Sequence, residues 1–173
     1  MKSEYTEALH AGQKQYKESV ARGEYPYLPV LDKMLPAHQM AVGTDLGLVQ
    51  IPLEYIVGTR SEGRTTSFAR NFMPLADETS EFASKWKRLC RTHLEEGISQ
   101  PVKAYEYRNR FYVEEGHKRV SILKYFGAVN IPGTVTRILP EQDGSEYTEL
   151  YYEFVDFYEI DPGDGIEIYK FII

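Results

Sequence analysis

A cationic triplet, His117-Lys118-Arg119, follows Gly116 at the point where a strand pattern becomes a helix pattern. The first backbone N–H groups of a helix have no partner within it, and together with the helix dipole they attract anions. Lysine and arginine are unfavourable at this end of a helix unless an anion offsets their charge. The planar fork of arginine also suits phosphate oxygens. The sequence therefore predicts a phosphate-binding site at Gly116, His117, Lys118 and Arg119.

The alternative for the triplet is purely structural. Lys118 could point into solvent, or Lys118 and Arg119 could pair with nearby carboxylates and bind no ligand. The candidate partners are Glu81, Glu114 and Glu115.

Two residues of this segment, Glu115 and His117, are the candidate catalytic groups. Glu115 could orient a magnesium ion or accept a proton from a nucleophile, and it could equally stabilise the loop through a hydrogen bond. His117 could donate to a phosphate, act as a general base, or begin the helix without a chemical role.

A polar loop, GTRSEGRTTSFARN at residues 58–71, is a candidate second wall for the same pocket. Guanidinium and hydroxyl groups are interleaved there with glycines, which is a composition suited to phosphate. The sequence predicts phosphate contacts from Arg64, Thr65, Thr66 and Arg70. The alternative is an ordinary solvated loop.

Cysteine and histidine do not predict a metal site. The single cysteine, Cys90, excludes an internal disulfide and a cysteine-rich zinc site, and it fits a reducing compartment. His10, His38 and His93 are scattered without ligand spacing.

Hydrophobic spacing and turn residues predict the elements that hold these side chains in place. Helices are predicted over residues 3–22, 80–96, 117–126 and 150–160. Strands are predicted over residues 48–58 (interrupted at Pro52), in a hairpin over 101–115, and over 131–140 and 165–173. The hairpin is expected to turn at Arg108-Asn109, since asparagine tolerates the left-handed conformation of such turns.

The order of these elements predicts an α+β fold with a small mixed β-sheet flanked by helices. Three parts are expected along the chain. They are an N-terminal helix with a Pro/Tyr-rich arm (1–45), a central domain (46–140), and an acidic C-terminal extension packed on that domain (141–173).

Composition and charge narrow the classes of function. The chain has 173 residues, 42% hydrophobic and 13% aromatic, which is typical of a folded domain. Residues 141–173 carry a net charge of −9 and the rest +3, so a broad basic surface for DNA is absent. No apolar run reaches the roughly 18 residues of a membrane helix, and no signal peptide is visible. We therefore expect a cytoplasmic protein.

The central part of the chain, roughly residues 48–140, resembles the ParB N-terminal/sulfiredoxin-like superfamily, which includes the ParB-like nuclease domain. In that family an Ile-Pro-Leu strand leads to a loop with an arginine before a phenylalanine. A later strand with the box V-(D/E)-G-x-(H/R)-R leads into a helix that opens on nucleotide phosphates. The matching residues are Arg64 and Phe68 in the first box, Val113, Glu115, Gly116 and Arg119 in the second, and the following strand from Ala128 to Ile138.

The resemblance implies that a nucleotide (ATP, ADP or CTP) binds between the Arg64 loop and the Gly116–Arg119 helix start. For an enzyme of this kind it implies magnesium-dependent phosphoryl transfer or nucleotide hydrolysis, in which positioning and charge neutralisation supply most of the catalysis. Two family features are missing. His117 stands where sulfiredoxins carry their catalytic cysteine, and a short acidic segment follows where ParB proteins have a helix-turn-helix domain.

The alternative function is a non-catalytic regulatory or protein-interaction module of the same fold. A protein partner or a second copy of the chain would then dock on residues 1–36 or on the acidic C-terminal part. A DNA-binding or nuclease domain has the least support, because such binding depends on phosphate neutralisation by a broad basic surface.

Overall fold

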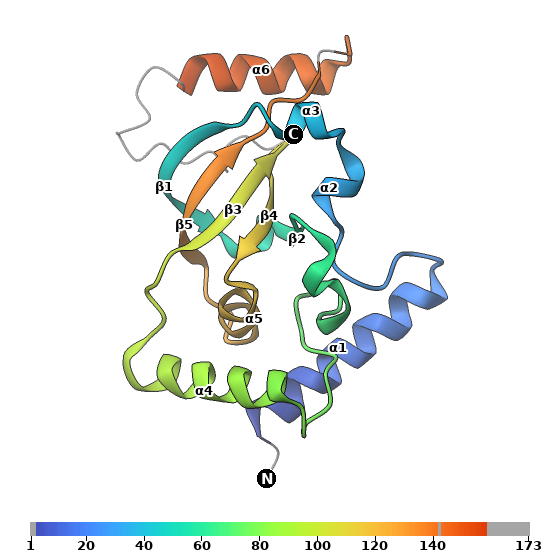
Figure 1. The fold of residues 1–173 in the computed structure, drawn as a ribbon, viewed down its shortest axis with the longest axis vertical. Helices are drawn as coiled ribbons and strands as arrows, with labels where there is room; N and C mark the ends of the chain where they lie inside the picture. The colour runs from blue at the N-terminus through green and yellow to red at the C-terminus, as the bar shows by residue number, and fades with distance from the viewer. Residues whose placement is uncertain (1–2, 142, 159–173) are drawn as a thin grey trace.

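The computed structural model describes residues 3–141 and 143–158, apart from the side chains of residues 64–65 and 154–158. In this part of the chain it is an α+β fold, with one five-stranded mixed sheet and six α-helices (Figure 1). The strands are β1 (Thr44–Pro52), β2 (Ile56–Thr59), β3 (Val102–Tyr107), β4 (Arg110–Glu115) and β5 (Asn130–Arg137). The helices are α1 (Glu4–Ala21), α2 (Leu31–Met34), α3 (Ala37–Met40), α4 (Glu81–Glu96), α5 (His117–Tyr125) and α6 (Glu146–Tyr158).

The sheet has the strand order β1-β5-β3-β4-β2, which confirms the predicted mixed sheet. β1 with β5 and β3 with β4 pair antiparallel, whereas β3 with β5 and β2 with β4 pair parallel. In Figure 1, β4 ends directly above α5, and α4 and α1 lie beyond α5, farther from the sheet. The junction of β4 and α5 therefore lies between the sheet and α4 (Figure 1).

The predicted strand over residues 48–58 is two strands at opposite edges of the sheet. β1 pairs with β5 up to Pro52, opposite Asn130. Proline has no N–H to donate to a ladder, so it suits the end of a strand. A 3₁₀ turn, η1 (Leu53–Tyr55), then redirects the chain, and β2 runs beside β4. The interruption at Pro52 was predicted, but its consequence for the sheet order was not.

The hairpin of β3 and β4 turns where the sequence predicts. Arg108 and Asn109 both have positive φ, 50° and 62°, as a two-residue turn of this hand requires. Ala104 lies opposite Val113, and Glu106 lies opposite Phe111. The hairpin places Glu114 and Glu115 at the end of β4, immediately before α5.

The helices α1, α4 and α5 share one hydrophobic cluster. Trp86 on α4 is fully buried, packs edge-to-face on Tyr5 of α1, and donates its indole N–H to Ser121 Oγ of α5 at 3.0 Å. Cys90 is buried in the same cluster, as its helical spacing indicated, and burial raises the pKa of its thiol. None of the helices in the described part is both long and apolar enough to cross a membrane.

The Pro/Tyr-rich arm lies against β2 and shares the core of the sheet. Leu28 and Leu31 are fully buried, and the N–H of Thr59 in β2 donates to the Pro29 carbonyl at 2.9 Å. The arm contains the single-turn helix α2, and the single-turn helix α3 follows it; Pro36 stands at the N-cap of α3, where a missing N–H costs nothing.

The helix α6 begins four residues earlier than its hydrophobic pattern indicates. It starts at Glu146 within the expected acidic loop, because the Ser145 hydroxyl accepts the N–H of Thr148 at 3.2 Å and caps the first turn. The strand predicted over residues 165–173 lies outside the described residues.

Candidate anion-binding site at the start of helix α5

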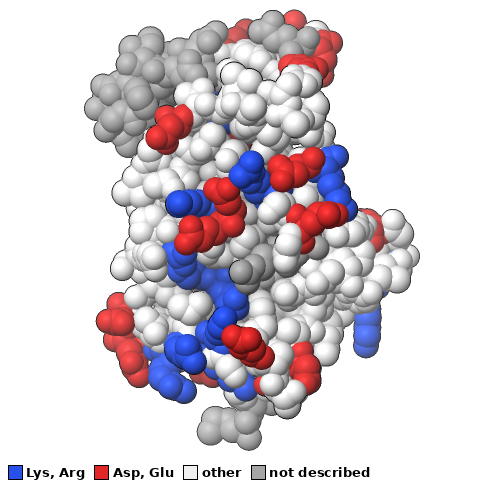
Figure 2. Space-filling view, viewed as in Figure 1, with Lys and Arg blue, Asp and Glu red and all other residues white. Residues whose placement is uncertain are grey.

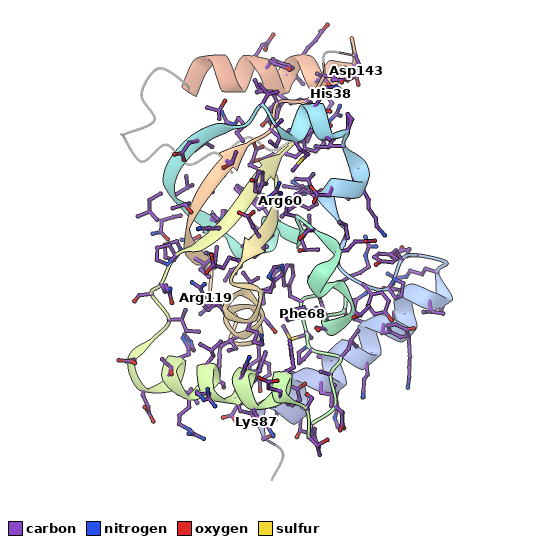
Figure 3. All side chains as sticks on the ribbon, viewed as in Figure 1. His38, Arg60, Phe68, Lys87, Arg119 and Asp143 are labelled. Carbon is purple, nitrogen blue, oxygen red and sulfur yellow. The ribbon has the colours of Figure 1, made fainter. Side chains whose placement is uncertain are left out.

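A pocket of about 250 Å³ lies at the junction of β4 and α5. One wall is formed by Glu114, Glu115 and the first residues of α5. The other wall is formed by Leu89 of α4 and by Phe68 of the loop after β2. Figure 3 labels Arg119 and Phe68 on the two sides of α5, above α4. Five of the predicted site residues meet in this pocket: Glu115, Gly116, His117, Lys118 and Arg119.

Gly116 gives the pocket its shape. It is the N-cap of α5, with φ 108° and ψ 24°, a conformation that residues with a side chain rarely adopt. A Cβ on this residue would lie 2.5 Å from Cγ1 of Val102, which is closer than carbon atoms can approach. No side chain caps the start of α5. The first N–H groups of α5 therefore have neither an acceptor within the helix nor a capping side chain.

His117 is buried, with 9% of its surface exposed, and it holds the junction together. Its Nε2 lies 2.8 Å from Thr59 Oγ1, and that hydroxyl is also 3.1 and 3.2 Å from the carbonyls of Ser61 and Val113. Carbonyls only accept hydrogen bonds, so the hydroxyl proton points to them and Nε2 donates to Thr59.

One face of the His117 ring stacks on the ring of Phe68, with ring centroids 6.1 Å apart and ring planes 24° apart. Its hydrogen bond and its stacking tie α5 to β2 and to the loop after β2. This arrangement orients the helix start and commits Nε2 of His117 to a structural hydrogen bond.

Arg119 lies on the opposite side of the pocket and binds the segment before β3. Its Nη1 donates to the carbonyls of Gln100 and Pro101, at 2.9 and 2.8 Å. Burial lowers the pKa of the guanidinium, while the nearby carboxylate of Glu115 raises it. Arg119 thus contributes positive charge to the pocket and also anchors the chain between α4 and β3.

Lys118 extends from α5 towards α4. Its Nζ lies 4.9 Å from the centroid of the Phe82 ring, in a cation–π contact. Such a contact holds an ammonium over the face of the ring. Lys118 is therefore a cationic group of the pocket wall.

Each carboxylate considered as a partner of the triplet pairs with another cation, and Glu115 also lies close enough to Arg119 to raise the pKa of its guanidinium. Glu114 accepts from Arg60 Nη1 at 2.6 Å, and Glu115 lies 3.8 Å from Lys103 Nζ. Glu81 pairs with Lys85 at 3.1 Å within α4. Glu115 is exposed at the rim of the pocket, where it is accessible to a ligand or a hydrated cation.

The polar loop contributes less to this pocket than its composition predicts. Thr66 is exposed in the 3₁₀ helix η2 (Glu62–Ser67) and does not line the pocket. Arg70 donates to the Tyr25 carbonyl at 2.9 Å and lines a different cleft. The side chains of Arg64 and Thr65 lie outside the described part of the structure. Among the loop side chains that the structure describes, Phe68 lines the pocket.

Positive charge gathers on this face of the molecule. Figure 2 shows a band of Lys and Arg side chains that runs over α5 and α4, with acidic side chains beside it. α4 contributes exposed cations, namely Lys85, Lys87, Arg88 and Arg91. The band is local, so it would attract a small polyanion rather than support binding along a duplex.

One residue that positions the site was not identified in the sequence. Thr59 accepts from His117 across 58 residues of chain. Its only sequence signal is a hydroxyl residue at the end of a strand, and the pairing depends on β2 lying beside β4.

The described residues contain no group of three or more His, Cys, Asp or Glu side chains that could hold a metal ion. Comparisons with protein-family models, curated proteins and solved structures give no match. What this site offers is a helix start without a side-chain cap, an enclosed glycine turn and two cationic side chains around a small pocket.

Proposed function

We propose that this chain binds the phosphate end of a nucleotide in the pocket at the start of α5, as a domain of the ParB/sulfiredoxin-like kind. The observation that carries the proposal is the meeting of Gly116, Lys118 and Arg119 around one small pocket. Helix N–H groups and cationic side chains directed at the same space are the usual means of holding phosphate. The resemblance of the Val113–Arg119 box to that family supports the same ligand.

The volume of the pocket limits what it holds. At about 250 Å³ it lies below the roughly 300–1,000 Å³ of pockets that enclose whole small ligands. It suits one or two phosphate groups, with the nucleoside lying over the rim. The sequence does not select between ATP, ADP and CTP, so the base is a matter for the binding experiment.

Any chemistry at this pocket would depend on Glu115. Two exposed carboxylates line the pocket. Glu114 is held by Arg60 at 2.6 Å, whereas the contact of Glu115 with Lys103 is loose at 3.8 Å. Magnesium binds nucleotides largely through phosphate oxygens and water, with one or two carboxylates. Glu115 is the residue that would hold it here, and the ion would supply charge neutralisation for phosphoryl transfer or hydrolysis.

The test is a thermal-shift panel of ATP, ADP, CTP, GTP and inorganic phosphate, each with and without magnesium. The variant of choice is Lys118→Gln, because Arg119 also anchors the carbonyls of Gln100 and Pro101. Lys87→Gln is the matched control, since Lys87 also lies over an aromatic ring, that of Tyr5, but outside the pocket.

A ligand at about 100 times its Kd adds roughly 2.7 kcal/mol to stability, which is several degrees for a domain of this size. We expect a shift with at least one nucleotide, an affinity at least about tenfold weaker in Lys118→Gln, and no change in Lys87→Gln. If Lys118→Gln bound the nucleotide as tightly as wild type, the ligand would not be bound in this pocket. A panel without any shift would favour the interaction module.

A further inference from the structure

A second and larger cleft, of about 770 Å³, lies between the arm and β2. The arm contributes Pro29, Val30 and Met34 to its lining, and the β2 segment contributes Ile56 and Val57. The last turn of α5 closes one side through Lys124. The volume falls within the roughly 300–1,000 Å³ of sites for small molecules, and the apolar lining is typical of them.

The charges that line this cleft are mostly positive. Lys33, Arg70 and Lys124 face a single lining carboxylate, Glu54. Lys33 is engaged by Glu62, outside the lining, and this bond raises the pKa of its ammonium. A cleft of this size with an excess of cations favours an anionic ligand.

Lys124 forms no ion pair with a carboxylate among the described residues. Its Nζ lies 5.3 Å from the centroid of the Phe72 ring, and no acceptor among the described residues lies within bonding distance of it. Burial lowers the pKa of this ammonium to about 8. An ammonium removed from water without an acceptor is costly, and a bound anion would offset that cost.

Arg70 extends the positive wall. Its guanidinium donates one hydrogen bond to the Tyr25 carbonyl at 2.9 Å, and the same fork carries further N–H groups that could serve a ligand in the cleft. Tyr25 and Tyr112 also line the cleft, and rings of this kind pack against aromatic ligands.

We propose that this cleft binds a small organic anion with an aromatic or apolar body, and that Lys124 holds its anionic group. The head is a carboxylate or a phosphate ester, since one ammonium and one guanidinium accommodate either. The site is separate from the pocket at the other end of α5. Nine helical residues separate the ends of this helix by roughly 12 Å.

The experiment is calorimetric titration with benzoate and phenyl phosphate, and with benzyl alcohol as the uncharged analogue. Lys124→Met keeps the length of the side chain and removes its charge, and Lys87→Met removes a charge from outside the cleft. We expect wild type to bind at least one of the two anions at least tenfold more tightly than the alcohol. Lys124→Met should lose at least tenfold in affinity for that anion, and Lys87→Met should lose nothing.

A pH series isolates Lys124 even if Lys124→Met folds poorly. The other groups facing it are Lys33, Glu54, Arg70, Tyr25 and Tyr112. An ammonium with a pKa of about 8 is mostly charged at pH 7 and mostly neutral at pH 9. Wild type should therefore lose about tenfold in affinity between those values. Lys124→Arg, which stays charged, should not, because a pH effect from the other groups would persist in it.

The relative affinity of the two anions identifies the head group, and tight binding of either supports the site. Three results would overturn the proposal. They are wild type binding neither anion at 10 mM, Lys124→Met binding like wild type, and Lys124→Arg losing affinity at pH 9 as wild type does. The second of these results, together with a loss of affinity in Lys118→Gln, would place the anion at the start of α5 instead.

Discussion

At the scale of single residues, Gly116 decides whether a helix start can face a pocket at all. Its backbone has a φ of 108°, and its missing side chain leaves room for Val102 of β3. The same residue ends the strand that carries Glu114 and Glu115 and begins the helix that carries His117. Any other residue at this position would lose stability twice, once from the positive φ and once from the contact of its Cβ with Val102.

Gly116→Ala should lower the free energy of unfolding by about 2–5 kcal/mol, because the left-handed backbone costs about 1–2 kcal/mol and overpacking about 1–3 kcal/mol. Gly127→Ala is the matched control. Gly127 also has positive φ, 73°, but a Cβ there would meet nothing within 4 Å. Urea denaturation of both variants separates the two costs. Equal losses in the two variants would show that the contact with Val102 does not constrain this turn.

The sequence predicted which residues gather around Gly116, but it did not predict which distant residues they contact. The cationic triplet, the glycine and Glu115 are neighbours in the chain, so local spacing was sufficient to place them together. Lys124 in the last turn of α5 has the pattern of an exposed lysine that complements the helix dipole. Only the folded arm, distant in sequence, makes it part of a cleft.

At the scale of elements, α6 is held to the sheet by a buried polar network. Glu106 of β3 and Arg137 of β5 are 1% and 2% exposed, and Arg137 Nε donates to Glu106 Oε2 at 3.2 Å. Tyr151 of α6 donates its hydroxyl to the same carboxylate at 2.6 Å, and the N–H of Asn109 donates at 2.7 Å. Burial raises the pKa of Glu106 while Arg137 lowers it, so each donor matters to the network.

Tyr151→Phe should lower the free energy of unfolding by about 1.5–3 kcal/mol, because it removes a donor from a buried group paired with a cation. Tyr147→Phe, on the same helix, removes a 2.7 Å bond to the Arg108 carbonyl, for which about 0.5–1.5 kcal/mol is expected. Chemical denaturation of the two variants compares them directly. A smaller loss for Tyr151→Phe than for Tyr147→Phe would contradict a central role for the network in docking α6.

The elements themselves were predictable where their signals are local. α1 and α4 begin at Ser3 and Ser80, whose side chains accept N–H groups of their first turns, and the hairpin turns at Asn109 as expected. The placement of β1 and β2 at opposite edges was not predictable, because strand order depends on contacts far apart in the chain. α6 was predicted late, since its first turn is acidic and polar.

At the scale of the whole molecule, α5 separates two candidate sites. Its start faces the pocket of Gly116, Lys118 and Arg119, and its end places Lys124 in the cleft of the arm. This short helix packs against α4 and, through Val120 and Leu123, into the core of the sheet. Leu28 of the arm lies in one cluster with the sheet residues, and Trp86 of α4 donates to α5. Residues 24–36 are therefore part of the structure that positions both sites.

The most direct measurement of the central claim is a titration with inorganic phosphate and then ATP, followed by the amide ¹H–¹⁵N resonances of the chain. The account predicts saturable shifts centred on the amides of Gly116, His117, Lys118 and Arg119, and shifts that weaken about tenfold in apparent affinity in Lys118→Gln but not in Lys87→Gln. Shifts that never saturate, or that spread over the exposed lysines of α4 and spare the start of α5, would contradict a phosphate site at this helix.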